Sequence, residues 1–104
     1  MAAKYLKSNG FKILDTNFRC AIGEIDIVAK EKDAIVFIEV KTRKSDNLAG
    51  PFESIGKRKQ NKIRDLAEYY IQEKDYSDCE IKFDVLSIVR DGQNNKIEYI
   101  ANAF

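Results

Sequence analysis

Two neighbouring segments of the chain read Gly23-Glu24-Ile25-Asp26-Ile27-Val28 and Val36-Phe37-Ile38-Glu39-Val40-Lys41. Both are rich in isoleucine and valine, which is typical of strands that are buried on both faces of a sheet. Each is interrupted by charged residues, and a buried carboxylate costs free energy unless it is paired or binds a metal ion. The charged positions of these two strands are therefore the first candidates for a functional site.

The spacing of the two segments predicts a hairpin. The polar residues between them can form a two-residue turn at 32–33. That turn would set Asp26 opposite Glu39 and Glu24 opposite Lys41, with all four side chains on one face of the sheet. A turn longer by one residue would reverse their relative faces.

The two facing acids have two interpretations. Carboxylates directly opposite each other repel and destabilise a strand pair. A divalent cation between Asp26 and Glu39 would remove that repulsion, because Mg²⁺ prefers oxygen ligands. The alternative is two independent ion pairs, one between Glu24 and Lys41 and one between Asp26 and a basic side chain elsewhere. Composition alone does not separate the two interpretations.

Composition limits the chemistry that the chain can perform. The 104 residues, 44% of them hydrophobic, suit one domain with a modest core, which we assign to residues 1–104. Histidine is absent, which excludes Ser–His and Cys–His nucleophilic sites and histidine-bound zinc. Cys20 and Cys79 are expected to be reduced thiols that pack as small hydrophobic residues. The sequence has no apolar run of membrane-spanning length and no recognisable leader, so we expect a cytoplasmic protein without membrane association.

The pattern along the chain predicts an α/β fold of order αβββαββ, with a single mixed sheet of about five strands flanked by helices. An apolar stripe at helical spacing between 63 and 71 predicts a long helix, with Ser54 as its cap. A polar loop is expected at Thr42–Gly50 and a turn at 91–94. The other expected elements are a helix at Ala2–Asn9 closed by Gly10 and strands at Phe11–Arg19, Glu24–Lys30, Ala34–Lys41, Glu80–Arg90 and Lys96–Ala101.

Charge is unevenly distributed along the chain. The net charge is +1, but residues 41–64 contain eight basic and two acidic residues and carry +6, which leaves −5 on the remainder. Several of these cations fall in the first turns of the long helix, where the helix dipole disfavours them and a bound phosphate would offset the cost. A solvated basic face is the alternative, but continuity with Lys41 favours phosphodiester binding. The candidate phosphate contacts are Arg43, Lys44, Lys57, Arg58, Lys59 and Lys62.

Asp26 followed by Glu39-Val40-Lys41 resembles the motif of the PD-(D/E)xK nucleases. The chain as a whole resembles the bacterial YraN family, also called UPF0102. Members of that family usually carry a glutamate in the first helix ahead of the match, and this chain has none there. The matching segments are Ala3-x-Tyr5-Leu6, Gly10-Phe11-x-Ile13-Leu14, Asn17-x-Arg19, Gly23-Glu24-Ile25-Asp26, Phe37-Ile38-Glu39-Val40-Lys41-x-Arg43, Gly50-Pro51, Lys59, Ala67-x-Tyr69, Phe83-Asp84-Val85 and Ile100-x-Asn102-Ala103-Phe104.

The resemblance implies a restriction-endonuclease-like core, shared with archaeal Holliday junction resolvases. It also implies a metal-dependent endonuclease that hydrolyses phosphodiester bonds in DNA, with branched or junction DNA among the expected substrates. Asp26 and Glu39 would hold Mg²⁺ or Mn²⁺ together with the carbonyl oxygen of Val40, and Lys41 would orient or help to deprotonate the attacking water. Glu24 would bind a second ion or pair with Lys41.

Further expectations follow from the same resemblance. Arg19 would contact a phosphate near the site. Junction-cutting relatives act as two-fold dimers, so a homodimer is one expectation for this chain. A non-catalytic nucleic-acid-binding module that retains the nuclease fold is the alternative function, and it would bind DNA with a steep salt dependence without cutting it. A small interaction protein with a solvated charged surface would do neither.

Overall fold

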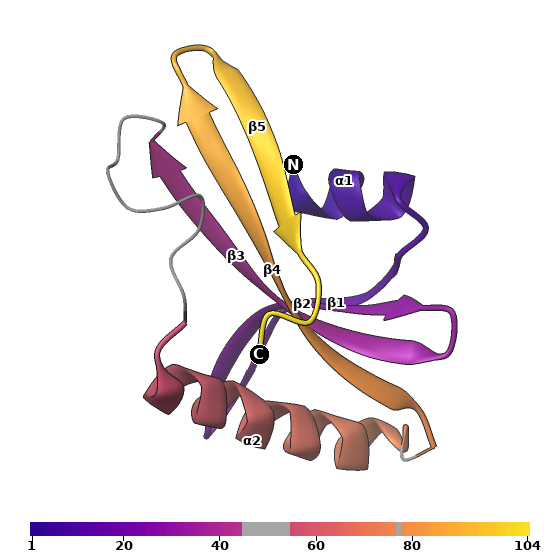
Figure 1. The fold of residues 1–104 in the computed structure, drawn as a ribbon. Coiled ribbons are helices and arrows are strands. Elements are labelled where there is room, and N and C mark those ends of the chain that lie inside the picture. Colours follow the sequence, from indigo (N-terminus) through magenta and orange to yellow (C-terminus); the bar gives the residue numbers. More distant parts are fainter. Residues whose placement is uncertain (45–54, 77) are drawn as a thin grey trace.

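The chain forms an α/β fold in the predicted order αβββαββ, seen in a computed structural model that describes residues 1–44, 55–76 and 78–104 (Figure 1). The elements are α1 (Ala2–Ser8), β1 (Lys12–Cys20), β2 (Gly23–Glu31), β3 (Ala34–Lys44), α2 (Lys57–Lys74), β4 (Glu80–Asp91) and β5 (Asn94–Ile100). One sheet holds the five strands in the order β1-β2-β3-β4-β5, with β3 and β4 parallel and the other neighbours antiparallel. In the described part of the chain, neither helix has the length and apolar character needed to cross a membrane.

Each helix packs against its own apolar cluster on the sheet. Leu6 of α1 belongs to a cluster that contains Val36 and Ile38 of β3, whereas Ile35 and Phe37 of the same strand pack with α2. The alternation follows from strand geometry, because successive side chains point to opposite faces. The predicted apolar stripe of α2 is confirmed, and its buried members are Ile63, Leu66, Ala67, Tyr70 and Ile71.

The hairpin of β2 and β3 has the predicted register, but its ladder is short. Pairing runs from the turn at 32–33 as far as Ile27 and Ile38. The ladder between β1 and β2 continues farther, to Gly23. Strand β2 therefore leaves β3 at Asp26 and remains with β1.

Two predicted boundaries are wrong by more than one residue. Strand β3 continues through Lys44, where a loop was expected, because its parallel pairing with β4 extends as far as Arg90. Strand β5 begins at Asn94, which shortens the predicted turn to 92–93. Residues 45–50 of the expected polar loop and Ser54, the expected cap of α2, lie outside the described residues, and the N-cap of α2 is Gly56.

A hydrogen bond from tyrosine to aspartate fastens α2 to the sheet, and a second one joins β5 to β4. The Tyr70 hydroxyl donates to Asp15 Oδ2 at 2.7 Å. The Tyr99 hydroxyl donates to Asp84, a carboxylate that is 2% exposed and also accepts from the Asn102 N–H at 2.8 Å. Burial, and then the hydrogen bonds to the carboxylates, raise the pKa of both tyrosines. Asp84 is thus a structural residue.

Candidate active site

Asp26 lies where β2 stops pairing with β3. Its side chain accepts a hydrogen bond from a backbone N–H of β3 that has no partner in the ladder. Asp26 Oδ2 accepts a hydrogen bond from the Val40 N–H at 2.8 Å. The N–H and C=O groups of one residue in an extended strand point to the same edge. The Val40 carbonyl oxygen is therefore directed toward β2 as well, on the edge of β3 where the Asp26 carboxylate binds.

Glu39 supplies a second, more deeply buried carboxylate. It is 9% exposed, and its Oε1 lies 2.6 Å from Nζ of Lys59. Lys59 stands in the first turn of α2 and its side chain is half exposed. A carboxylate buried to this extent needs a partner. Lys59, which we expected to contact phosphate, meets that need in this structure.

Lys41 follows Glu39 on the same face of β3. Phe37 packs on the α2 side of the sheet, and alternation along the strand places Glu39, Lys41 and Arg43 on that side as well. Lys41 is half-buried, and the described residues include no ion-pair partner for it. Its ammonium group is therefore available to an anion that approaches Glu39.

Glu24 has an ion-pair partner of its own on β1. Its Oε2 lies 3.0 Å from Nε of Arg19, its cross-strand neighbour on β1. The expected pairing of Glu24 with Lys41 is wrong, because β2 leaves β3 at Asp26 and stays paired with β1. Arg19, the expected phosphate contact, consequently has a carboxylate partner.

The oxygen donors at the departure of β2 suit a divalent cation. Asp26 uses Oδ2 and Glu39 uses Oε1 in their hydrogen bonds, which leaves one oxygen of each carboxylate available. Mg²⁺ is commonly bound through one or two carboxylates, with substrate phosphate and water as its other ligands. Nowhere in residues 1–44, 55–76 and 78–104 do three or more Asp, Glu or Cys side chains gather as a metal cluster. The predicted donor set of Asp26, Glu39 and the Val40 carbonyl would therefore supply two carboxylates to such an ion.

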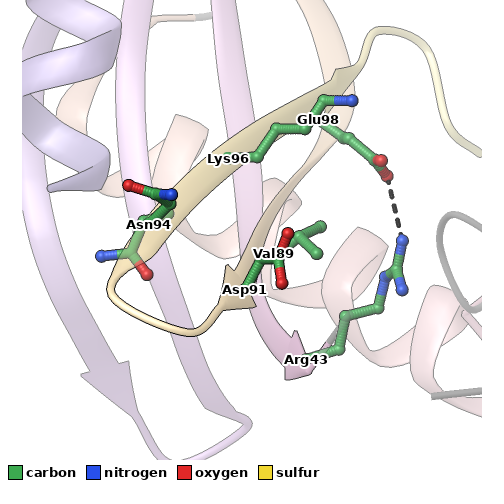
Figure 2. A pocket seen from close by; sticks show the side chains of 7 residues that line it. Arg43, Val89, Asp91, Asn94, Lys96 and Glu98 are labelled. Carbon is green, nitrogen blue, oxygen red and sulfur yellow. Dashed lines mark hydrogen bonds and ion pairs between the residues drawn. The ribbon is translucent and has the colours of Figure 1, made fainter. Parts of the chain in front are cut away.

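Farther along β3, Arg43 is paired with an acid that we did not predict. Arg43 Nη2 lies 3.5 Å from Oε2 of Glu98 on β5, and both side chains are largely buried (Figure 2). The pair borders a hollow of about 420 Å³ to which Asp91 and Lys96 also contribute. The charges of two acids and two cations cancel around this hollow, so it is a poor candidate for a phosphate-binding site. The pairing of Glu98 with Arg43 could not be predicted from the sequence, because it depends on the order of strands in the sheet.

The basic residues of α2 differ in what surrounds them. The Arg64 guanidinium lies 4.9 Å from the ring centroid of Phe83 and 5.6 Å from that of Phe104, so it is a packing residue. The first turn of α2 contains no acid, and Gly56 offers no side-chain cap. Some of the candidate phosphate contacts are exposed and form no ion pair with any described residue. They are Lys44, Lys57, Arg58 and Lys62.

Comparison with known proteins identifies the family of the chain. Residues 1–88 match the family described as "Uncharacterised protein family UPF0102". A UPF0102 protein of Caldicellulosiruptor bescii is 49% identical over 107 residues, which cover 100% of this chain and 90% of the relative. The chain belongs to the UPF0102 family. UPF0102 proteins of Clostridium acetobutylicum (45% identical, 96% of this chain and 84% of the relative) and Clostridium botulinum (46% identical, 100% and 87%) are also similar.

The predicted UPF0102 resemblance is thereby confirmed over the whole chain. The family description names no reaction. The function of this UPF0102 protein therefore has to be argued from the chemistry of its candidate site.

Proposed function

We propose that this UPF0102 protein is a cytoplasmic, metal-dependent endonuclease that hydrolyses phosphodiester bonds in DNA. The observation that carries the proposal is the arrangement of Asp26, Glu39 and Val40 at the departure of β2, with Lys41 next on the same face of β3. An acid followed by Glu-x-Lys on the adjoining strand resembles the PD-(D/E)xK arrangement.

In the proposed mechanism each residue of the site has a distinct role. Asp26 and Glu39 would hold Mg²⁺ or Mn²⁺ through carboxylate oxygens, with the Val40 carbonyl as a further ligand. When bound, such an ion would lower the pKa of water and neutralise charge on the phosphoryl oxygens. Lys41 orients the attacking water and stabilises the charge that develops at phosphorus. Lys59, once released from Glu39, faces the phosphate.

The charge of the surrounding surface supports a nucleic-acid substrate. Residues 41–64 carry +6 in a chain whose net charge is only +1. The exposed cations at the start of α2 lie on the helix that reaches Glu39 through Lys59. A polyanion held by these cations is therefore brought to the acids of the site.

One observation favours a second candidate function, a nucleic-acid-binding module that does not cut. Lys59 Nζ lies 2.6 Å from Glu39 Oε1, where an ammonium group already neutralises the carboxylate. If that pair persists when nucleic acid binds, the exposed cations of α2 still contact phosphates, but Glu39 is not available to a metal ion.

Cleavage of labelled DNA separates the two functions. Linear, flapped and four-way DNA are incubated with Mg²⁺, Mn²⁺ or EDTA and the wild-type chain, and with the variants Asp26→Asn and Lys41→Met. We expect metal-dependent cutting that falls about 100-fold or more in each variant, while thermal melting confirms that both variants fold. Cutting retained by one variant removes that residue from the site. Salt-sensitive binding without cutting by any of the three proteins favours the binding module.

The same panel addresses the expected homodimer. A two-fold dimer would cut the two strands of a four-way junction symmetrically, because it carries two equivalent sites. Sedimentation of the chain with and without junction DNA measures the assembly directly. Nicking of one strand by a monomer would contradict this part of the proposal.

A further inference from the structure

A hollow of about 520 Å³ lies beside the proposed active site, between the first turns of α2 and the start of β2. Lys59 lines it and also contacts Glu39 at 2.6 Å, so the hollow adjoins the acids of the site. Its charged lining residues are Glu24, Arg58, Lys59 and Lys62, and its apolar ones are Ile63 and Leu66.

The hollow retains positive charge after its ion pairs are counted. Glu24 is paired with Arg19 at 3.0 Å, and Lys59 is paired with Glu39. Neither Arg58 nor Lys62 forms an ion pair with any residue that the structure describes. Two exposed cations therefore face the hollow without a counter-ion, above an apolar floor.

Lys62 reaches this position by crossing Gly23 at the start of β2. A Cβ atom added to Gly23 would lie 2.7 Å from Lys62 Cε and 3.5 Å from Lys62 Nζ. A contact of 2.7 Å between carbon atoms is well inside their optimal separation. Any side chain at Gly23 would therefore push Lys62 aside. The displaced atoms are the flexible end of an exposed lysine, but Gly23 also has φ +156°, a conformation that residues with a side chain rarely adopt, so a substitution there strains the backbone as well.

We propose that this hollow binds one phosphodiester group of the substrate strand, adjacent to the bond that is cut, and that Gly23 is a positioning residue for Lys62. That the bound phosphate belongs to a substrate strand rests on the proposed function. That the hollow binds a phosphate is independent of the proposed function, because binding requires neither the metal ion nor cleavage. Lys62 and Arg58 contact the phosphate oxygens, and Lys59 links this subsite to Glu39.

Binding measured without metal tests the subsite. Fluorescence anisotropy of a labelled duplex in EDTA is recorded over a range of KCl concentrations. We expect Lys62→Ala to weaken binding several-fold and to make the slope of log affinity against log salt shallower by about 0.9, the loss of one phosphate contact. Gly23→Ala should cause a similar loss although it removes no charge. Lys74→Ala, at the opposite end of α2, is the matched control and should leave the slope unchanged.

The double variant Gly23→Ala, Lys62→Ala gives the sharpest outcome. It should bind no more weakly than Lys62→Ala alone, because both changes remove the same contact. Additive losses, or wild-type binding by a folded Gly23→Ala variant, would overturn the role of Gly23. An unchanged slope for Lys62→Ala, or a wild-type chain that binds no DNA, would overturn the subsite even if Gly23→Ala fails to fold. A wild-type chain that binds DNA but does not cut it would overturn only the proposed nuclease activity and would leave the phosphate subsite standing.

Discussion

Asp26 is the residue on which the arrangement of the site depends. Its carboxylate accepts the Val40 N–H, so the backbone donor released by the end of the ladder stays satisfied. Glu39 is held differently, by the ammonium group of Lys59. A backbone partner cannot move away from Asp26, whereas a lysine side chain can leave Glu39. The exchangeable partner of the site is therefore Lys59.

Replacing Lys59 by methionine is expected to tighten Mn²⁺ binding several-fold in isothermal titration calorimetry, because Glu39 loses the cation that competes with the metal. In the absence of metal, the same change leaves the Glu39 carboxylate unpaired. The free energy of unfolding should then fall by about 1–3 kcal/mol. Glu24→Gln, which breaks a more exposed pair, should cost less than about 1 kcal/mol. Weaker Mn²⁺ binding by Lys59→Met would contradict the role of Lys59 as a competitor.

The acids and the lysine of the candidate site could be selected from the sequence, but most of their partners could not. Two apolar runs and a two-residue turn specify the register of the hairpin, which holds as far as Ile27 and Ile38, one residue short of Asp26 and Glu39. The predicted pairing of Glu24 with Lys41 is wrong because the ladder between β2 and β3 ends at Ile27 and Ile38, and the pattern of the hairpin does not show where a ladder ends. The partner of Glu39 depends on how α2 lies over β3, and no local pattern encodes that.

At the scale of single elements, the start of α2 is poorly suited to a helix that only stabilises the fold. Lys57, Arg58 and Lys59 occupy its first turn, which contains no acid, and Gly56 provides no side-chain cap. The partial positive charge at a helix N-terminus disfavours such cations. The same features favour an anion at this end of the helix.

Lys57→Glu is expected to stabilise the protein and weaken DNA binding at once. An acid in the first turn should add about 0.3–1 kcal/mol to the free energy of unfolding, measured by urea denaturation. The same variant should bind DNA more weakly in the anisotropy assay. The matched control Lys74→Glu places the acid in the last turn, where it should destabilise the helix and leave DNA binding nearly unchanged. DNA binding of wild-type strength by Lys57→Glu would contradict the proposed role of this turn.

The two hydrogen bonds from tyrosine to aspartate predict sensitivity to alkali. Burial and the acids Asp15 and Asp84 raise the pKa of Tyr70 and Tyr99 in the folded chain above the ordinary value of 10.0. The folded state thus holds these protons more tightly than the unfolded state does. Their stabilisation is fully present below about pH 10 and is lost as the pH rises through the folded pKa. Urea denaturation should show this decline, and Tyr99→Phe should reduce it. An equal decline in both proteins would disprove the assignment.

The order and type of the elements could be predicted because each has a distinct local pattern. Alternating or continuous apolar runs marked the strands, and the stripe between 63 and 71 marked α2. The end of β3 could not be predicted in the same way. Residues 42–44 are polar and resemble a loop, yet they pair in parallel with residues 88–90 of β4. That pairing joins segments far apart in the chain, so nothing in the local sequence reveals it.

At the scale of the whole molecule, β3, β4 and β5 continue past the departure of β2 and away from α2 (Figure 1). The candidate acids lie at this departure. The charge is divided as well, with +6 on residues 41–64 and −5 on the remainder. Such a division orients a polyanion toward one part of the surface, although the net charge is close to zero.

Mn²⁺-dependent DNA cleavage by two variants that each lose one carboxylate is the decisive measurement. Glu39→Gln removes the proposed metal ligand, and Glu31→Gln removes an acid at the turn end of the same hairpin that is paired with Lys82. We predict that Glu39→Gln loses about 100-fold or more of the wild-type rate, whereas Glu31→Gln keeps most of it. Equal rates for the two variants, or a loss confined to Glu31→Gln, would contradict a metal site built on Asp26 and Glu39.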